Sequence, residues 1–430
     1  MRKLIFALLL ILGCSLSVFA EKISWQMVEA QTLKNSPSVR AAKLTLDNAR
    51  QMHKGTSLSP YLPKVSLNGK GIRWNSKDSQ TSKDGEAPYN LEATIGFSLK
   101  PCAHYEEIKN CCIALKIAEL DYKRSVSGVI FNSKKLYLDL IMANEEVKMA
   151  ERTRERCIGN EILITLEHRS GKANTGQLEE KKARVLVAER SLKKAQKRVK
   201  EISVDLLVAM GRDDIETILE VDKQIVFPKK VIKKPDYNSL VTTTPEFLIA
   251  QYNFEKAKVS KMVAPSKWLP SVNFNGGYRP KVGSKDSRWG VNFKDGTWNA
   301  GISLSYDIFT GFRRCYDSKI DSNNFQAASL GFLEKTDSLK KKAEELYNEL
   351  VDAYEDMETA KNNLESSKFR NKFAEKEYAN GLLGYDEWCL ADDEYVRAQE
   401  NLLKSKKTVA LKIAEWYNFT CDDLTKDKEE

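Results

Sequence analysis

Long hydrophobic runs are missing from this sequence. Beyond the first 20 residues, no apolar run reaches about 18 residues, the shortest stretch that usually spans a membrane as a helix. The composition is 42% hydrophobic and 30% charged with 21 glycines, which is unlike that of a disordered chain. An internal transmembrane helix and a wholly disordered chain are therefore both excluded.

Histidine is scarce, and the common catalytic motifs are absent. The chain has three histidines, His53, His104 and His168, and none lies in an HExxH arrangement. There is also no phosphate-binding GxxxxGK[ST] loop and no GxSxG nucleophile motif. We therefore expect a protein that is not an enzyme and that binds no cofactor.

The eight cysteines form no CxxC pair. One of them, Cys14, lies near the N-terminus, and the other seven are Cys102, Cys111, Cys112, Cys157, Cys315, Cys389 and Cys421. The odd number of these seven cysteines and their spacing argue against a zinc site or a redox motif. The length of the chain excludes a small disulfide-bonded scaffold. We interpret these residues as small side chains on helices. Whether two of them form one disulfide is left open by the sequence.

The formal net charge is +9, and the basic excess is distributed in short runs such as Lys193-Lys194. We interpret these runs as solvated faces of helices. Because no recognised nucleic-acid-binding module is present, we expect no nucleic-acid partner.

The N-terminus has the pattern of a secretory signal peptide. Arg2-Lys3 is a basic start, Leu4 to Leu12 is a short apolar core, and Val18-Phe19-Ala20 fits the small-residue cleavage rule. This predicts a signal peptide over residues 1–20. An alternative is that Ile11-Leu12-Gly13-Cys14, which looks like a bacterial lipoprotein box, directs lipidation of Cys14.

One short segment occurs twice. Residues 62–69 read LPKVSLNG and residues 269–276 read LPSVNFNG, identical at five of eight positions and about 207 residues apart. Such spacing predicts two copies of one structural plan. We place the first repeat at 21–227 and the second at 228–421, followed by a disordered tail at 422–430.

Proline placement supports this division. All eleven prolines lie within 37–101 or 228–280, and because proline breaks helix interiors, the remaining tracts can hold long helices. Ser36-Pro37 and Thr244-Pro245 each resemble a helix N-cap followed by proline at the first helical position. They predict a short helix in each repeat.

Apolar and polar residues alternate in four segments, which predicts strands with one apolar and one polar face. The predicted strands are 65–74, 90–99, 272–279 and 298–307. Loops at about 75–89 and 282–296 would join them into two hairpins. The first strand changes phase at Gly69-Lys70-Gly71, which indicates a bulge. We therefore expect it to be the strand that departs from regular pairing.

Long helices are predicted after each hairpin. They cover about 104–167 and 313–379, and return helices cover about 177–210 and 385–418. A helix over 104–167 would be about 90 Å long. The first return helix carries apolar residues at Leu178 and Val185 and then at alternating steps of three and four to Ala209, a coiled-coil seam.

The lengths of the predicted strands and helices limit what can surround the sheet. The strands have the length of about 10 residues that is typical of transmembrane β-strands, and in lipid such strands need a closed barrel. Four strands cannot close, since the smallest barrels have about eight. Membrane insertion would therefore require several copies to share one barrel. The alternative is a soluble sheet with one buried face, but helices of about 90 Å are too long to cover it and must project away.

In this order and spacing, the motifs resemble the TolC-like outer membrane efflux proteins of Gram-negative-type bacteria. The resemblance extends from about Trp25 to Thr420. It rests on the paired Ser/Thr-Pro entries, the paired Leu-Pro-x-Val strands, and the turns at Gly171 and Gly381 before the return helices. It implies an α+β membrane protein. Two β-hairpins would contribute to a shared trimeric outer-membrane barrel, and long antiparallel helical hairpins would form a periplasmic tunnel.

The resemblance also implies function and partners. A homotrimer in outer membrane lipid would be the passive exit duct of a tripartite efflux or type I secretion system. It would receive substrates from an inner-membrane transporter with a periplasmic adaptor, or membrane fusion protein. The alternative function is a periplasmic coiled-coil adaptor or structural protein. Adaptors normally have one helical hairpin per chain, so the two predicted hairpins favour the duct.

The family closes its tunnel near the helix-to-helix turns, which implies candidate aperture residues. Tyr378, three residues before Gly381, matches the family's aperture tyrosine. Glu387 stands where the family often has a constricting aspartate, and Gln177 stands at the equivalent position of the first repeat.

Leu390 occupies the next position at which the family has an acid, and Asp386, Asp392 or Asp393 could replace it. A ring of such carboxylates would favour cations. The alternative for Asp386 and Glu387 is that they stabilise the N-terminus of the return helix, where carboxylates are favoured anyway.

Overall fold

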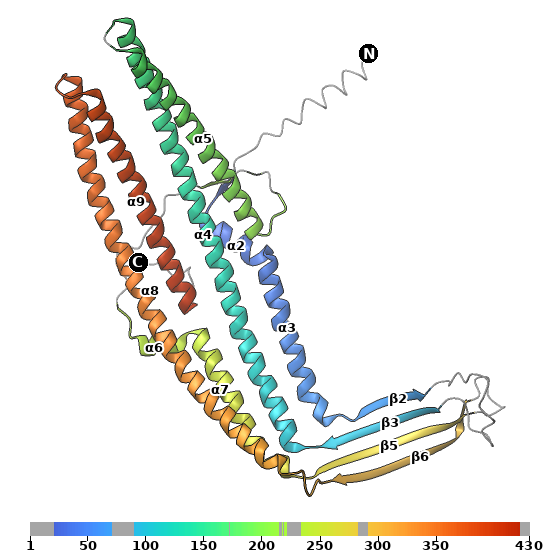
Figure 1. The fold of residues 1–430 in the computed structure, drawn as a ribbon. Helices are drawn as coiled ribbons and strands as arrows, with labels where there is room; N and C mark the ends of the chain where they lie inside the picture. The colour runs from blue at the N-terminus through green and yellow to red at the C-terminus, as the bar shows by residue number, and fades with distance from the viewer. Residues whose placement is uncertain are drawn as a thin grey trace, which may run out of the picture. The chain divides into compact units, whose positions relative to one another are not determined.

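The computed structural model describes residues 21–70, 90–171, 173–214, 217, 219–221, 234–282 and 291–421. The predicted signal peptide with Cys14, the loop at 75–89 and the tail at 422–430 lie outside the described residues. The chain divides into two compact units, and Figure 1 labels their helices and strands. Unit 1 comprises Met1–Leu44, Asp121–Pro245 and Asp337–Glu430, and unit 2 comprises Thr45–Leu120 and Glu246–Thr336. Each unit thus combines segments from both sequence repeats.

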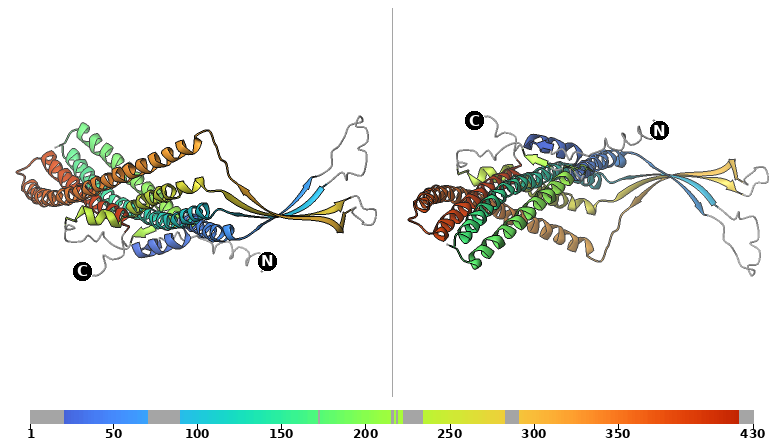
Figure 2. Two further views of the ribbon diagram at one scale, coloured as in Figure 1. Left: turned by 90° about the horizontal axis from the view of Figure 1, so that it is seen from below. Right: turned by 90° about the horizontal axis from the view of Figure 1, so that it is seen from above.

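Unit 2 contains a four-stranded antiparallel sheet. Its strands are β2 (Lys64–Lys70), β3 (Asn90–Leu99), β5 (Ser271–Val282) and β6 (Val291–Ser305), in the order β2-β3-β5-β6. The two hairpins are joined through the pairing of β3 with β5. The sheet is twisted, as Figure 2 shows, which is usual for strands of L-amino acids.

The register of the sheet separates apolar from polar residues, as the alternation predicts. Ile95 pairs with Val65, Phe97 with Phe274, and Phe274 with Ile302. One face therefore carries an apolar surface across all four strands, and the other face carries mainly Ser, Thr and Asn. On the polar face the hydroxyls of Ser66 and Thr94 lie 2.7 Å apart in a hydrogen bond.

The second hairpin differs from the prediction in two details, and the bulge predicted at Gly69-Lys70-Gly71 lies partly outside the described residues. β2 pairs regularly with β3 from Lys64 to Lys70, so the described part of the first strand has no bulge. The irregularity lies in the second hairpin, where residues 293–296 of β6 stand opposite Pro280 of β5. Proline has no N–H to donate to the ladder, so regular pairing is interrupted there. In addition, β6 already begins at Val291, within the predicted loop at 282–296.

Each hairpin of the sheet is preceded in the chain by a short helix and followed by a long one. The two long ones are α4 (Pro101–Arg169) and α8 (Arg313–Ala379), with 69 and 67 residues. The short helices α3 (Pro37–Leu58) and α7 (Pro245–Val263) begin at the prolines that the sequence marked. Each runs into a 3₁₀ turn, η1 (Ser59–Tyr61) and η2 (Ala264–Trp268) respectively, just before a strand. Among the described residues, no helix has both the length and the apolarity to cross a membrane.

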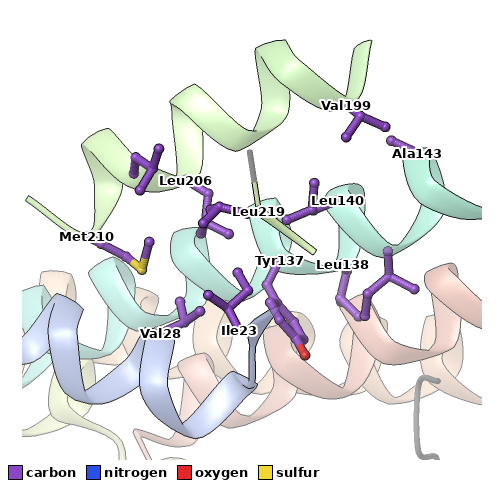
Figure 3. Packing of buried hydrophobic residues seen from close by; sticks show 12 residues of the cluster. Ile23, Val28, Tyr137, Leu138, Leu140, Ala143, Val199, Leu206, Met210 and Leu219 are labelled. Atoms are coloured by element: carbon purple, nitrogen blue, oxygen red, sulfur yellow. The ribbon is translucent and has the colours of Figure 1, made fainter. Parts of the chain in front are cut away.

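Unit 1 is held together by a buried apolar cluster (Figure 3). The elements around it include α2 (Trp25–Asn35), α4, α5 (Thr175–Ala209) and the short parallel pair β1 (Glu21–Ile23) and β4 (Leu219–Val221). Leu140, Leu206, Met210 and Leu219 are fully buried in this cluster. The strands β1 and β4 were not predicted, because three residues are too few to show a period.

Unit 1 also contains the return helix α9 (Tyr385–Thr420) and the short helix α6 (Tyr237–Thr243). A second apolar cluster joins α8 to α9 through Leu350, Ala353, Val409 and Ile413. Together, α4 with α5 form the first hairpin, and α8 with α9 form the second.

The hairpin turns share one backbone geometry. Gly171 and Gly381 have φ values of 74° and 71°, the left-handed region in which glycine is favoured. The Gly171 N–H donates to His168 O at 3.1 Å, and the Gly381 N–H donates to Tyr378 O at 2.9 Å. Each long helix therefore ends at the glycine that the sequence indicated.

Candidate functional site

The candidate site lies in unit 1, at the ends of the two hairpins. Tyr378, in the last turn of α8, stacks on Trp388 of α9 with ring centroids 5.2 Å apart and planes 7° from parallel. Burial raises the pKa of the Tyr378 phenol above its ordinary value, and the Glu167 carboxylate and the Cys389 thiol add to this effect. The phenol is therefore protonated at neutral pH and can donate a hydrogen bond. Since Glu167 belongs to α4, Tyr378 also lies near the first hairpin.

Gln177 and Glu387 occupy equivalent capping positions. The Asn174 N–H donates to Gln177 Oε1 at 3.0 Å, and the Gln177 N–H donates to Asn174 Oδ1 at 2.8 Å, a complete capping box. In the second hairpin, the Gly384 N–H donates to Glu387 Oε2 at 3.3 Å. Glu387 thus stabilises the helix start and, as an exposed carboxylate, also leaves negative charge at the tip.

Asp386 forms an ion pair between the hairpins. Its carboxylate lies 3.7 Å from the Lys181 ammonium of α5, and the side chains are 90% and 6% exposed. The lysine is therefore shielded while its partner is open to solvent. Because exposed ion pairs contribute at most about 1 kcal/mol, this contact orients Lys181 more than it stabilises the unit.

A stronger link between the hairpins centres on Arg156 of α4. Its guanidinium contacts the Asp392 carboxylate and lies 3.1 Å from Asp393 Oδ1, both on α9. Asn371 of α8 donates from Nδ2 to Asp392 Oδ1 at 3.0 Å. We call Arg156, Asn371, Asp392 and Asp393 the Arg156 link; it connects three helices. Its side chains are partly or largely shielded from water, which strengthens charge-assisted contacts.

Sequence reasoning identified the acids of the Arg156 link but not their partner. Asp392 and Asp393 were candidates to replace the acid missing at Leu390, which is itself exposed. Arg156 lies in the middle of a long helix rich in charged residues, and no local pattern distinguishes it. Only the packing of one hairpin on the other identifies it.

A cavity of about 670 Å³ lies between α4, α5 and α9 in unit 1. We call it the hairpin groove. Its lining mixes charged side chains, including Arg156, Lys181 and Asp393, with the sulfur-containing side chains Cys157 and Cys389. Among the described residues, no group of three or more His, Cys, Asp or Glu side chains could hold a metal ion.

The chain is similar to known outer membrane channels. Residues 237–414 match the family described as outer membrane efflux protein. The described fold is similar to the CmeC outer membrane channel of Campylobacter jejuni, with a TM-score of 0.75 and 16% identity over 94% of this chain and 88% of CmeC. The resemblance to the TolC-like outer membrane efflux proteins is confirmed.

Two further channels of this TolC-like group have the same fold. The MtrE outer membrane channel of Neisseria gonorrhoeae matches with a TM-score of 0.73 and 15% identity, over 94% of this chain and 91% of MtrE. CusC matches with a TM-score of 0.74 and 16% identity, over 94% of this chain and 93% of CusC. No curated protein sequence matches the chain. The family consists of transport channels rather than enzymes, so the comparisons support an outer membrane efflux channel.

Proposed function

We propose that this protein is the trimeric outer membrane exit duct of a tripartite efflux or type I secretion system. Three copies share one β-barrel in the outer membrane, and their helical hairpins form a tunnel in the periplasm. Substrates enter from an inner-membrane transporter through a periplasmic adaptor and leave to the exterior. The duct itself is passive: the sequence has no nucleotide-binding motif, so the transporter supplies the energy.

The observation that carries this proposal is the uncovered apolar face of the sheet in unit 2. Trp298 and Ile302 of β6 are 78% and 71% exposed, and Val65 and Leu67 of β2 are similarly exposed. Full burial of one such side chain is worth about 1.5–3 kcal/mol. A face of this size needs a partner, and outer membrane lipid suits an apolar surface of strands about 10 residues long.

The edges of the sheet support closure with further copies of the chain. In the described residues, β2 and β6 each pair on one side only, and edge amides in lipid would lack hydrogen-bond partners. Because each copy contributes an even number of alternating strands, β6 of one copy would meet β2 of the next in antiparallel orientation. Three copies therefore give a closed, fully antiparallel barrel with the even strand number that is usual in bacteria.

The polar face supports a water-filled lumen. It presents residues such as Thr94 and Asn275, and it carries the ion pair between Glu92 of β3 and Arg279 of β5, at 3.5 Å. Charged groups are costly on a lipid-facing surface but are readily solvated in an aqueous channel.

The tips of the hairpins would form the periplasmic aperture. We propose that Tyr378 and Glu387 narrow it, with Asp386 and Gln177 at its rim, and that the Arg156 link holds the two hairpins together. We also keep the signal peptide over residues 1–20 as part of the proposal, with lipidation at Cys14 as its alternative.

Membrane fractionation tests the duct against the adaptor. We expect the full-length protein in the outer membrane fraction, migrating as a heat-modifiable trimer on gels. A soluble monomer recovered from the periplasm would overturn the duct and favour the coiled-coil adaptor. Once the trimer is found in the outer membrane, cross-linking in cells followed by purification would identify the transporter and the adaptor that bind the helical tips.

A further inference from the structure

Two cysteines from different hairpins line the same groove in unit 1. We propose that Cys157 of α4 and Cys389 of α9 form a reversible disulfide that locks the first hairpin to the second. The disulfide itself depends only on the geometry of unit 1. Its consequence for conduction rests on the proposed channel function.

The position of Cys389 follows from its neighbours on α9. Asp386, Cys389 and Asp393 are spaced by three and four residues, so they share one face of the helix. Asp386 contacts Lys181, and Asp393 contacts Arg156, both on the first hairpin. Cys389, between them, therefore faces the first hairpin as well, in agreement with its place in the hairpin groove.

The position of Cys157 follows in the same way. Thr153, Cys157 and Asn160 are spaced by four and three residues, so they share one face of α4, and all three line the groove together with Cys389. Burial raises the pKa of the Cys157 thiol, Arg156 and Arg184 oppose this, and Asp393 and Cys389 of α9 add to it. The residues that influence this thiol thus come from both sides of the groove.

No other described cysteine lines the hairpin groove. Cys111 and Cys112 are adjacent on α4 in unit 2, and Cys315 is exposed on α8 in the same unit. All seven described cysteines are free in this structure.

The chemistry is thiol–disulfide exchange with a disulfide oxidant. The thiolate of one cysteine attacks a sulfur of the oxidant, forms a mixed disulfide and releases one oxidant thiolate. The second cysteine then attacks the protein sulfur of that mixed disulfide and displaces the other oxidant thiolate. The two protein thiols lose two electrons and two protons, and the oxidant is reduced to two thiols. The bacterial periplasm is an oxidising compartment in which such bonds persist.

The disulfide would add a covalent connection between the two hairpins to the non-covalent contacts of the Arg156 link. Separation of the hairpins in the reduced protein breaks non-covalent contacts alone: ion pairs, hydrogen bonds and the packing of Ala410 and Leu411 of α9 against the apolar cluster. In the oxidised protein it would also require reduction of a covalent bond, so oxidation would hold the tips of the hairpins together.

Peptide mapping tests the bond directly. The full-length protein, purified in detergent, is incubated with glutathione disulfide, alkylated without reduction, digested and analysed by mass spectrometry. We expect a cross-linked peptide that contains Cys157 and Cys389 in the wild type and in the control Cys315→Ser. It should be absent from Cys157→Ser and Cys389→Ser. Recovery of both residues as alkylated thiols or as glutathione adducts in the wild type would overturn the proposal.

Planar-bilayer recordings test the lock. We expect several-fold lower conductance for oxidised than for reduced wild-type protein, and no difference in Cys157→Ser or Cys389→Ser. A cross-link that leaves conductance unchanged would overturn the lock. A cross-link in a protein that forms no channel would support the disulfide and overturn the proposed function. A working channel without the cross-link would overturn the disulfide alone.

Discussion

The sheet of unit 2 and the helical core of unit 1 both carry apolar residues at regular spacing, yet they differ in what covers them. In the core, Leu140 and Leu206 are fully buried by other segments of the same chain. In the sheet, Trp298 and Ile302 are largely exposed. A hydrophobic period therefore locates an apolar face but does not identify its partner. For the core the partner is the chain itself, and for the sheet we propose lipid and further copies.

The largest expected effect is on the helical core. Leu206→Ala should destabilise unit 1 by about 2–5 kcal/mol, because it removes buried methyl groups and leaves a cavity. Denaturant unfolding followed by helical circular dichroism would measure this loss. Ile302→Ala in the sheet is the matched control and should change helix unfolding little. Equal losses in both variants would remove the distinction between the two regions.

A charge on either face of β6 tests the partner of the sheet. Ile302→Lys should weaken membrane assembly by about 2–4 kcal/mol, the cost of a basic residue on a lipid-facing strand at mid-membrane depth. Ser303→Lys, on the opposite face, should assemble normally because its ammonium would be solvated in the lumen. The measure is the fraction of heat-modifiable trimer in the outer membrane. Normal assembly of Ile302→Lys would show that the apolar face does not meet lipid.

Within unit 1, Arg156 and Arg198 allow contacts between hairpins to be compared with contacts inside one hairpin. Arg156→Ala leaves the shielded Asp392 carboxylate without its cation, which should cost about 1–3 kcal/mol and raise single-channel conductance. Arg198 pairs with Glu146 at 3.0 Å within the first hairpin and is half exposed. Arg198→Ala should therefore cost less than about 1 kcal/mol and leave conductance unchanged. Equal conductance in both variants would exclude a gating role for the Arg156 link.

The smallest effect on stability is expected at the tips, where function should change instead. Glu387→Ala combined with Tyr378→Phe should raise single-channel conductance and weaken cation preference, if these residues narrow the aperture. Glu387→Gln is the informative control, because it keeps an acceptor for the Gly384 N–H but removes the charge. A loss of cation preference in this control would assign the effect to charge. Unchanged conductance in the double variant would remove both residues from the aperture.

Much of the fold could be predicted because it depends on local rules. The alternation in β3 and β6, the prolines at the starts of α3 and α7, and the glycines after α4 and α8 each express a backbone preference of a few neighbouring residues. The same holds for the capping positions of Gln177 and Glu387. The sequence placed both residues beside the turns, and the structure adds their hydrogen bonds.

Other features could not be predicted, because their causes are distant in sequence. The three-residue strands β1 and β4 pair across almost 200 residues and show no period of their own. The phase change at Gly69-Lys70-Gly71 suggested a bulge, but pairing with β3 keeps the described part of that strand regular. The irregular site is opposite Pro280 instead, where the partner strand has surplus residues.

By itself, the sequence determined the duplication, the two faces of the strands and the places where the long helices end, since these follow from steric preferences and periodicity within one segment. Only the tertiary structure decided that Arg156 meets Asp392 and Asp393, and that Cys157 and Cys389 share one groove. Such contacts join residues more than 230 positions apart. They depend on how two amphipathic hairpins pack against each other, and many registers of the same helical pattern would bury similar apolar area. The charge and thiol contacts that distinguish one register from another become visible only when the hairpins are packed.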